Sequence, residues 1–256
     1  QRHGLKEFSA RTMQVLLPKS APQGDYEKYR RAVAPTEEQL NQQRKHRWDN
    51  PPLFSIVVPL YRTPIKYLEQ LVKSIQSQTY GNWELCLSDG SGADSPLEGY
   101  LNRLKQRESR VKVVCHGSSL QISDNTNAAI REAAGDYLVF ADHDDLLAED
   151  ALYECARVLQ EQPETELIYS DEDKVSMNGK RYFQPHFKSD YNPDLLCSMN
   201  YFCHLMVVRR SLAEQAGLLD GAFDGAQDYD FVLRCTEHTD RIVHIPKALY
   251  HWRAHE

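Results

Sequence analysis

Apolar, strand-like runs alternate with amphipathic segments from Leu53 to Ser170, and this alternation constrains the fold more than any other feature. Phe54–Pro59 is an apolar run bounded by prolines, which is typical of a strand buried on both faces. Between Leu68 and Ile75, apolar residues recur at i, i+3, i+4 and i+7, which predicts one face of a helix. The pattern continues with predicted strands at Trp83–Leu87, Val111–Cys115, Tyr137–Ala141 and Leu167–Tyr169, and with predicted helices around Ser95–Gln106, Asp124–Ala134 and Leu152–Leu159.

This series of strands and helices predicts an α/β fold with a mostly parallel central sheet and helices on both faces. After Ser170 the pattern loosens, and the segment Met177–Lys180 (MNGK) is typical of a hairpin tip. The remaining predicted elements are strands at Leu205–Arg209, Ile242–Ile245 and Ala248–Trp252, and a helix over Asp228–His238.

The first 52 residues differ from the rest, and we expect them to form a helical N-terminal extension. Asp25–Ala34 and Thr36–Trp48 are polar, and Thr36 followed by Gln39 fits a helix-capping box. We expect two or three short helices that pack onto the main domain, which begins at residue 53, and that carry no chemistry of their own. Because the first residue is Gln1 and not Met, we also expect the chain to be a piece of a longer one.

The charge distribution argues against nucleic acid as a partner. Residues 1–50 contain ten Lys and Arg against six Asp and Glu, whereas the remaining chain contains 20 against 31. A nucleic-acid-binding domain normally needs a basic groove, and the main domain is acidic. A small polyanionic ligand is compatible with this surface, because a divalent cation held by carboxylates reverses the local charge.

The composition indicates a soluble globular protein, and the cysteines indicate a reducing compartment. The chain is 41% hydrophobic and 26% charged, and its apolar runs are far shorter than the ~20 residues that span a bilayer. There is no N-terminal secretory pattern. The six cysteines show no CxxC spacing, which argues against structural zinc and favours free thiols. We therefore expect a cytoplasmic protein.

Carboxylates follow two of the predicted strands at the point where each strand ends. Asp89 follows the second strand, and the cluster of Asp142, Asp144 and Asp145 follows the fourth. In open α/β sheets, ligands bind beyond the carboxyl ends of the strands. Converging carboxylates disfavour stability and suit a hard divalent cation. We therefore expect a metal-binding crevice at this edge, with Asp145 acting in part as a helix cap.

The Asp-X-Asp pattern is weak by itself, because 19 Asp in 256 residues make about one such triplet expected by chance. Three occur: Asp142/Asp144, Asp171/Asp173 and Asp228/Asp230. Only the first directly ends an apolar strand of the alternating half, so we interpret it as functional. We interpret Asp171–Asp173 as a solvated turn.

Five segments of the sequence form a more specific signal than the triplets alone. In order they are FSIVVPLYRTP, LSDGSGAD, GDYLVFADHDD, GAQDYDFVLR and ALYHWRAHE. Together they resemble a family-2 glycosyltransferase, over Phe54 to His255. The resemblance implies a glycosyltransferase-A fold with a Rossmann-like sheet, in which 53–170 binds the nucleotide and 171–256 faces the acceptor. IYSDEDKV and PHFKSDYNPDLL also resemble bacterial enzymes that build O-antigen or capsule, where such domains are often joined in one long chain.

The resemblance implies residue roles on the donor side. Pro59 and Tyr61 would line the nucleotide base, and Asp89 would accept a hydrogen bond from a uracil or thymine ring. Asp142 would lie near the ribose and the metal, and Asp144 would bind Mn²⁺ or Mg²⁺ directly. The sequence departs from the family pattern at Ser88, where Asp is more frequent.

On the acceptor side, the resemblance implies that Asp228 is the catalytic base, next to Gln227 where the family has Glu. A metal-bound Asp144 is poorly suited to that role because its lone pairs are engaged, so a separate carboxylate is needed. His251 or His255 would reach the metal or the diphosphate, and Arg253 would add positive charge there. Tyr201 and His204 fit an acceptor pocket and a packed core equally well.

The sequence therefore predicts an inverting, metal-dependent glycosyltransferase that uses a nucleotide diphosphate sugar, with UDP or dTDP favoured. The expected acceptor is a glycan or a lipid-linked glycan, the latter allowing peripheral association with the inner face of the cell membrane. One alternative is a non-catalytic sugar-nucleotide-binding or scaffold domain of a larger polymerase. A sugar-phosphate nucleotidyltransferase is a weaker alternative, because that class has a Gly-rich loop after its first strand and Pro59–Pro64 contains no glycine.

Overall fold

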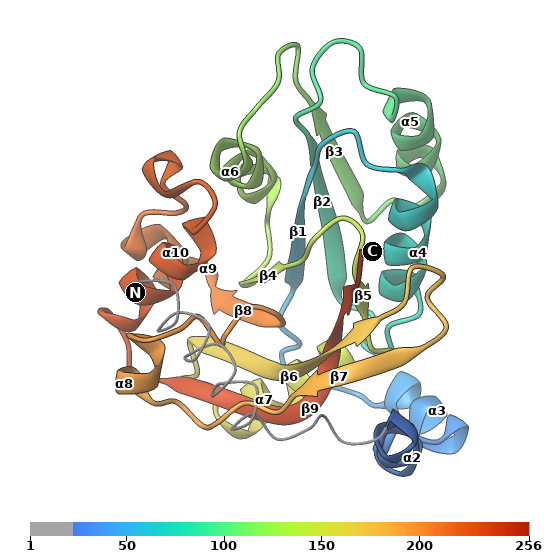
Figure 1. The fold of residues 1–256 in the computed structure, drawn as a ribbon, viewed down its shortest axis with the longest axis vertical. Coiled ribbons are helices and arrows are strands. Elements are labelled where there is room, and N and C mark those ends of the chain that lie inside the picture. The colour runs from blue at the N-terminus through green and yellow to red at the C-terminus, as the bar shows by residue number, and fades with distance from the viewer. Residues whose placement is uncertain (1–22, 256) are drawn as a thin grey trace, which may run out of the picture.

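The computed structural model describes residues 23–255, and its strands coincide in large part with the apolar runs of the sequence (Figure 1). The strands are β1 (Phe54–Leu60), β2 (Trp83–Asp89), β3 (Val111–Cys115), β4 (Tyr137–Phe140), β5 (Leu146–Leu147), β6 (Leu167–Val175), β7 (Tyr182–His186), β8 (Met206–Arg209) and β9 (Ile242–Arg253).

The helices are α2 (Gln23–Val33), α3 (Glu37–Lys45), α4 (Ile65–Gln76), α5 (Glu98–Arg107), α6 (Ile122–Glu132), α7 (Ala151–Glu161), α8 (Pro193–Leu196), α9 (Arg210–Ala216) and α10 (Gln227–Thr236), with a short 3₁₀ turn at Gly221–Phe223.

Among the described residues, all nine strands belong to one sheet, in the order β3-β2-β1-β4-β8-β6-β9-β5 with β7 paired to β6. The pairs among β3, β2, β1 and β4 are parallel. From β8 onward the pairing is antiparallel except between β6 and β9. The α/β fold class predicted from the sequence is confirmed, and the sheet as a whole is mixed because the C-terminal strands return in the opposite direction.

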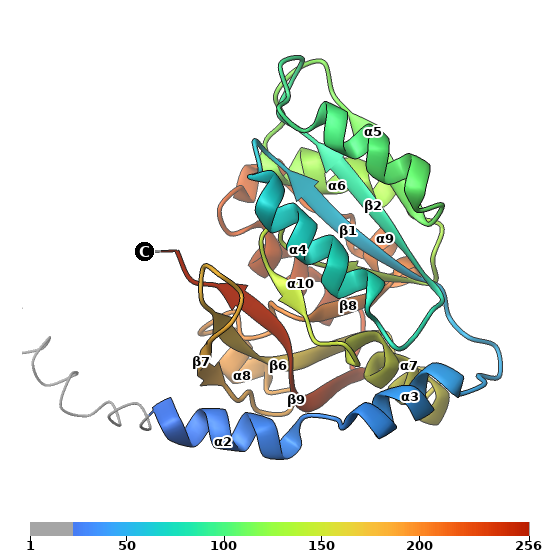
Figure 2. The same cartoon turned by 90° about the vertical axis from the view of Figure 1, so that its right-hand side faces the viewer.

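Helices cover both faces of the parallel part of the sheet (Figures 1 and 2). Phe54, Ile56 and Val58 of β1 belong to a core shared with α4, α5 and α7. Val57 between them belongs to a second core shared with α6, α9 and α10. Successive side chains of a strand point to opposite faces, so an apolar run without polar interruptions is what a doubly covered strand requires.

Two predictions for the C-terminal half are wrong. The strand predicted to stop at Tyr169 continues to Val175, so Asp171–Asp173 is not a solvated turn; Asp171 and Asp173 are 3% and 1% exposed. The strand continues because β9 and β7 pair along its two edges. Carboxylates can be buried there because each is hydrogen-bonded to groups that lie far away in the sequence.

The two strands predicted at Ile242–Ile245 and Ala248–Trp252 are one strand, β9. Ile245 pairs with Ser170 and Ala248 pairs with Asp171, so the two residues between them form a bulge. Pro246 has no N–H to donate to the ladder, which explains a local irregularity in place of a strand end. The hairpin tip predicted at Met177–Lys180 is confirmed, since it connects β6 to the antiparallel β7, and its Gly179 has a φ of 74°.

In the N-terminal extension, α2 and α3 run in line beneath the β6–β7–β9 side of the sheet (Figure 2). Thr36 and Gln39 form the predicted capping box, with Gln39 Oε1 accepting from Thr36 N at 2.8 Å. Tyr26 and Leu40 are buried against the main domain. Any structure in residues 1–22 lies outside the described residues.

All six cysteines lie within the described residues and are free thiols, as the sequence predicts. No helix in residues 23–255 has both the length and the apolar character needed to cross a bilayer.

Candidate active site

The carboxyl ends of β1, β2 and β4 meet at one edge of the sheet, where the sequence places its candidate residues. In the parallel register Leu60 pairs with Asp89, and Val57 pairs with Phe140. The residues that follow these strands therefore lie close to one another. The sequence predicts that Asp89 and the Asp142–Asp145 cluster converge on one crevice. In the structure Asp142 lines a pocket together with Pro59, and Asp89 does not line it.

A pocket of about 380 Å³ opens beside this edge. Its lining consists of Pro59, Tyr61, Ser119, Leu120, Gln121, Ile122, Asn125 and His143. The Tyr61 ring is 53% exposed and is available to a ligand. An adjoining pocket shares Pro59 and Ile122 and includes Asp142, His204, Gln227 and Asp228. The first pocket is within the range of roughly 300–1,000 Å³ found for small-molecule sites, whereas the adjoining pocket has a volume of only about 20 Å³.

Asp89 is 1% exposed, and its carboxylate is hydrogen-bonded within the turn that follows β2. Its Oδ1 accepts from the backbone N of Ser91 at 3.0 Å and from Ser91 Oγ at 2.5 Å, and its Oδ2 accepts from Ser95 Oγ. Ser88, at the departure from the family pattern, donates to Asn125 Oδ1 at 2.7 Å. The structure thus places Asp89 at the expected strand end, where it orders the loop next to the pocket.

Asp142 faces a buried histidine. Its Oδ2 lies 3.6 Å from Nε2 of His204, whose side chain is 5% exposed. Burial raises the pKa of the Asp142 carboxyl, but the adjacent His204 outweighs burial and holds that pKa below its usual value. Nδ1 of His204 is buried without a hydrogen-bond partner among the described residues. His204 lines the pocket, and its ring also packs against Tyr250 with 5.0 Å between the ring centroids. The side chain therefore belongs both to the pocket and to the packed core.

Asp144 faces the last strand. Its Oδ2 lies 2.5 Å from Nε2 of His255, and its side chain is 15% exposed. The His255 ring packs edge-on against Tyr67 of α4 at 6.1 Å. One of the two histidines expected near the metal motif is therefore beside Asp144.

The other histidine, His251, lies within β9 and contacts Asp173 of β6. Its Nδ1 lies 2.6 Å from Asp173 Oδ1, and its ring packs against Tyr182. His255 lies beyond the end of β9 at Arg253, so the alternation of the strand, which would put residues four apart on one face, does not set its direction. The structure does not bring His251 to Asp144.

Arg253 is 5% exposed, and its guanidinium is fully engaged. It donates to the carbonyl oxygen of Asp144 at 2.5 Å, to that of Met177 at 2.9 Å and to Gln70 Oε1 at 2.7 Å. Burial lowers the pKa of Arg253, and neighbouring carboxylates oppose that shift. The residue holds the Asp144 backbone in place and brings a positive charge beneath it.

Asp145, which the sequence placed in the carboxylate cluster, is hydrogen-bonded to Tyr250, which the sequence analysis did not single out. Asp145 does not cap a helix, since α7 begins at Ala151 with Asp150 as its N-cap residue. Tyr250 Oη donates to Asp145 Oδ2 at 2.8 Å and accepts from Asp142 N at 2.9 Å, while Arg253 N donates to Asp145 Oδ1 at 2.6 Å. Burial and the charge of Asp142 raise the pKa of Asp145 to about 7. In the sequence, only the motif ALYHWRAHE indicated that β9 contributes residues near the Asp142–Asp145 loop.

Asp228 lies in the first turn of α10, as its sequence predicts, and lines the pocket opposite Asp142. Its Oδ2 accepts from Gln227 Nε2 at 3.2 Å. Burial raises the pKa of the Asp228 carboxyl, and Asp142 raises it further while His204 lowers it. A carboxylate with a raised pKa at the mouth of a pocket is suited to accept a proton.

The donor set fits a divalent cation that is shared with a ligand. Within residues 23–255, no three His, Cys, Asp or Glu side chains converge closely enough to hold a metal by themselves. Asp144 and His255 meet, and Asp142 lies in the same loop. Mg²⁺ is commonly held by one or two carboxylates with the remaining positions filled by water and substrate phosphates. Carboxylate oxygens with one imidazole also suit Mn²⁺.

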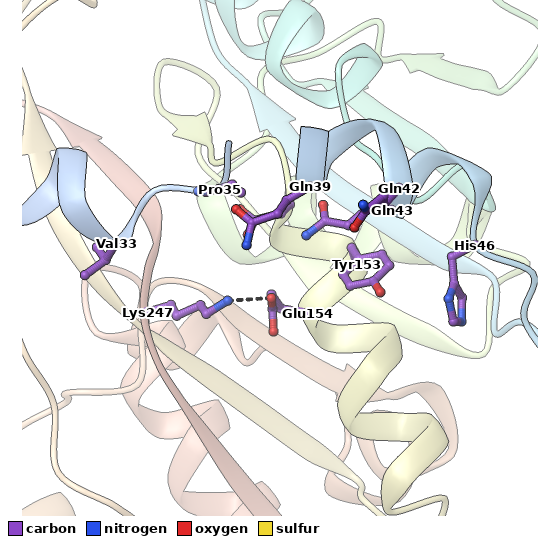
Figure 3. A pocket seen from close by; sticks show the side chains of 10 residues that line it. Val33, Pro35, Gln39, Gln42, Gln43, His46, Tyr153, Glu154 and Lys247 are labelled. Atoms are coloured by element: carbon purple, nitrogen blue, oxygen red, sulfur yellow. Dashed lines mark hydrogen bonds and ion pairs between the residues drawn. The ribbon is translucent and has the colours of Figure 1, made fainter. Parts of the chain in front are cut away.

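A separate pocket of about 400 Å³ lies at the junction of the N-terminal extension and the main domain (Figure 3). Gln39, Gln43 and Tyr153 line it, and Lys247 and Glu154 form an ion pair of 2.5 Å across its floor. None of the strand-end carboxylates lines it, so it does not belong to the candidate active site.

This architecture, with carboxylates beyond the strand ends and a facing carboxylate on α10, is that of the glycosyltransferase-A fold. Among solved structures, S. aureus TarS 1–349 in complex with UDP superposes with a TM-score of 0.64 at 20% sequence identity, covering 78% of this chain and 60% of that chain. The model of the family "Glycosyl transferase family 2" matches residues 55–216. The chain belongs to glycosyl transferase family 2.

Two curated relatives extend the match along the chain. An uncharacterized protein, y4gI, of Sinorhizobium fredii is 41% identical over 210 residues, which cover 81% of this chain and 23% of that protein. The O-antigen biosynthesis protein RfbC of Myxococcus xanthus is 36% identical over 236 residues, covering 92% of this chain and 18% of that protein. The chain thus matches about a fifth of the length of each relative.

Proposed function

We propose that this chain transfers a sugar from a nucleoside diphosphate sugar to a hydroxyl of a growing glycan, with inversion at the anomeric carbon. One observation carries the proposal: Asp142, His204 and Asp228 line one pocket at the strand ends, and Asp144 of the same loop contacts His255. The name of the M. xanthus relative supports a bacterial surface polysaccharide as the product. Such a product implies a glycan or lipid-linked acceptor, and action at the cytoplasmic face of the membrane.

For the donor, we assign the nucleotide base to the pocket at Pro59 and Tyr61. The exposed Tyr61 ring offers an apolar face, and the loop ordered by Asp89 closes one side. UDP is the favoured nucleotide because the structural neighbour TarS holds UDP, and dTDP is the second choice. The diphosphate then lies toward Asp142 and Asp144, where Arg253 supplies a buried positive charge.

For the chemistry, we assign the catalytic base to Asp228. Its carboxylate takes the proton of the acceptor hydroxyl while that oxygen bonds to the anomeric carbon. The bond from that carbon to the diphosphate breaks, and its electron pair leaves with the diphosphate. Attack from the face opposite the leaving group inverts the configuration. A divalent cation held by Asp144, His255 and Asp142 supplies Lewis-acid stabilisation of the leaving charge when it is bound.

A calorimetric titration tests the proposal. UDP, dTDP and GDP are each titrated into the protein with Mn²⁺ and with EDTA, and into Asp144→Ala. We expect one nucleotide to bind only with the metal, and the substitution to weaken that binding by about 100-fold. Absence of binding under every condition would contradict the donor site and favour the scaffold alternative, for which the departures at Ser88 and Gln227 are the sequence signal.

A further inference from the structure

A buried chain of hydrogen bonds links the N-terminal extension to the strand that supports the candidate site. Tyr26 of α2 donates its hydroxyl to Asp173 Oδ2 at 2.5 Å. The other oxygen of Asp173 lies 2.6 Å from Nδ1 of His251 in β9. The side chains of Asp173 and His251 are 0% and 7% exposed, and Tyr26 is 7% exposed. These three residues form a relay from α2 through β6 to β9.

The relay ends between the residues that hold the metal-motif loop. His251 lies in sequence between Tyr250, which bonds to Asp142 N and Asp145, and Arg253, which bonds to Asp145 and to the Asp144 carbonyl. The same strand leads directly to His255, which contacts Asp144. A shift of β9 at His251 would therefore move every contact between the strand and the loop.

A second contact from α2 supports the same point. The Arg30 guanidinium stacks at 3.8 Å over the Tyr182 ring, and Tyr182 packs edge-on against His251 at 4.7 Å. Helix α2 thus holds His251 through a hydrogen-bonded carboxylate and through an aromatic ring. Two independent contacts fix the position of a side chain better than either alone, because each limits the freedom that the other leaves.

The arrangement is not a hydrolytic triad. The Tyr26 hydroxyl donates to the carboxylate and not to the imidazole, so His251 is not placed to activate it. A buried carboxylate with a donor on each oxygen is satisfied and rigid, and it is costly to leave with one donor missing. Support of the strand is the role that this geometry serves.

We propose that Tyr26 and Asp173 are positioning residues of the active site, acting through His251 and β9 on the loop Asp142–Asp145. The N-terminal helix is then part of the support of the donor site, and not only the connector that its composition suggests. The effect on donor binding rests on the proposed function, whereas the effect on the loop itself does not.

The test compares Tyr26→Phe with Tyr29→Phe in the full chain. Tyr29 is on the same helix and 44% exposed, so its substitution is a matched control. Hydrogen exchange is followed by mass spectrometry in peptides that contain residues 142–145 and 250–255. We expect Tyr26→Phe to speed exchange there roughly fivefold, the effect of one lost hydrogen bond, while peptides from β1 and α4 and the Tyr29→Phe protein match the wild type.

Binding supplies a second readout. With Mn²⁺, the Kd for UDP should rise roughly fivefold in Tyr26→Phe and stay unchanged in Tyr29→Phe. Unchanged exchange in both peptides overturns the proposal, and so does equal acceleration throughout the chain, which shows general destabilisation. If the wild type binds no nucleotide, the proposed function fails, while the exchange data still decide whether α2 holds the loop. Asp173→Asn repeats the test from the other end of the relay, and Tyr26→Phe decides alone if that variant does not fold.

Discussion

The Asp142/Asp144 region and the Asp171/Asp173 region contain the same sequence pattern and differ in what surrounds it. β4 ends at Phe140, so Asp142 and Asp144 lie beyond the sheet, and Asp142 keeps a side chain that is 46% exposed. β6 continues through Asp171 and Asp173, and both are buried. Other groups of the chain occupy the carboxylate oxygens of the second pair. Asp171 accepts from Lys188 N and contacts His244, and Asp173 contacts Tyr26 and His251.

The comparison predicts that an Asp-X-Asp triplet binds a ligand only where the fold leaves carboxylate oxygens accessible. A third pair, Asp228 and Asp230, lies in the first turn of α10, and its members differ in the same way. Asp228 faces the pocket, whereas Asp230 forms an ion pair with Arg234 at 2.6 Å. The three pairs therefore predict different consequences for the same substitution.

The largest effect is expected for Asp228→Asn. The amide cannot accept the acceptor proton, so turnover should fall by about 1,000-fold while the Kd for the nucleotide stays within a factor of about three. Nucleotide release is measured with the UDP-sugar that the wild type turns over fastest. A fall in binding that matches the fall in turnover would show that Asp228 holds the donor instead.

Asp171→Ala should instead destabilise the fold. It leaves Nε2 of the 5%-exposed His244 and the Lys188 N–H without their partner, which should lower the free energy of unfolding in urea by about 3 kcal/mol. Asp190→Ala is the matched control, because Asp190 meets the same histidine at 3.2 Å but is 97% exposed. Equal effects of the two substitutions would refute the distinction between buried and open carboxylates.

Asp230→Ala should have a smaller effect, of about 1–2 kcal/mol on the free energy of unfolding, because Arg234 is a quarter exposed and keeps its bond to the Leu218 carbonyl. Nucleotide affinity should not change. A loss of affinity as large as that of Asp144→Ala would place Asp230 in the donor site and break the comparison.

The smallest effect is a pH dependence of stability at His244. Burial lowers the pKa of His244, but Asp171 and Asp190 outweigh burial and raise it above its ordinary value of 6.5. The protonated form is therefore stabilised in the folded state, and its contribution is complete below pH 6.5 and is lost as the pH rises through the raised pKa. Urea unfolding of the wild type should show this loss, and His244→Gln should not. A parallel decline in both proteins would assign it to other groups.

Much of the fold could be predicted from the sequence because the strands of the parallel half are rich in apolar residues, with few charged interruptions such as Glu84 and Lys112. β1, β2, β3 and β4 were each indicated by such an apolar-rich run, and Asp228 by its place at a helix start. The C-terminal half could not be predicted in this way. Burial of Asp173 depends on Tyr26 and His251, which are far away in the sequence, and no local pattern reports partners at that distance.

The candidate site, too, could be predicted from the sequence only in part. Pro59, Asp142 and Asp144 follow from strand ends, and their chemical roles came from a resemblance and remain predictions. His251 and His255 were indistinguishable by spacing, because the sequence does not reveal that β9 ends at Arg253 and that His255 lies beyond it. His204 and Tyr250 reach the site only through the pairing of β8 and β9 with earlier strands, which the sequence does not display.

The central claim is that the Asp142/Asp144 pair beyond the sheet binds the cation and the Asp171/Asp173 pair within β6 does not. An anomalous difference map from crystals grown with Mn²⁺ and UDP tests it most directly. The account predicts one peak, bonded to Asp144 and close to His255, with the UDP diphosphate completing its coordination. A peak at Asp171 or Asp173, or bound UDP with no peak at Asp144, would contradict it.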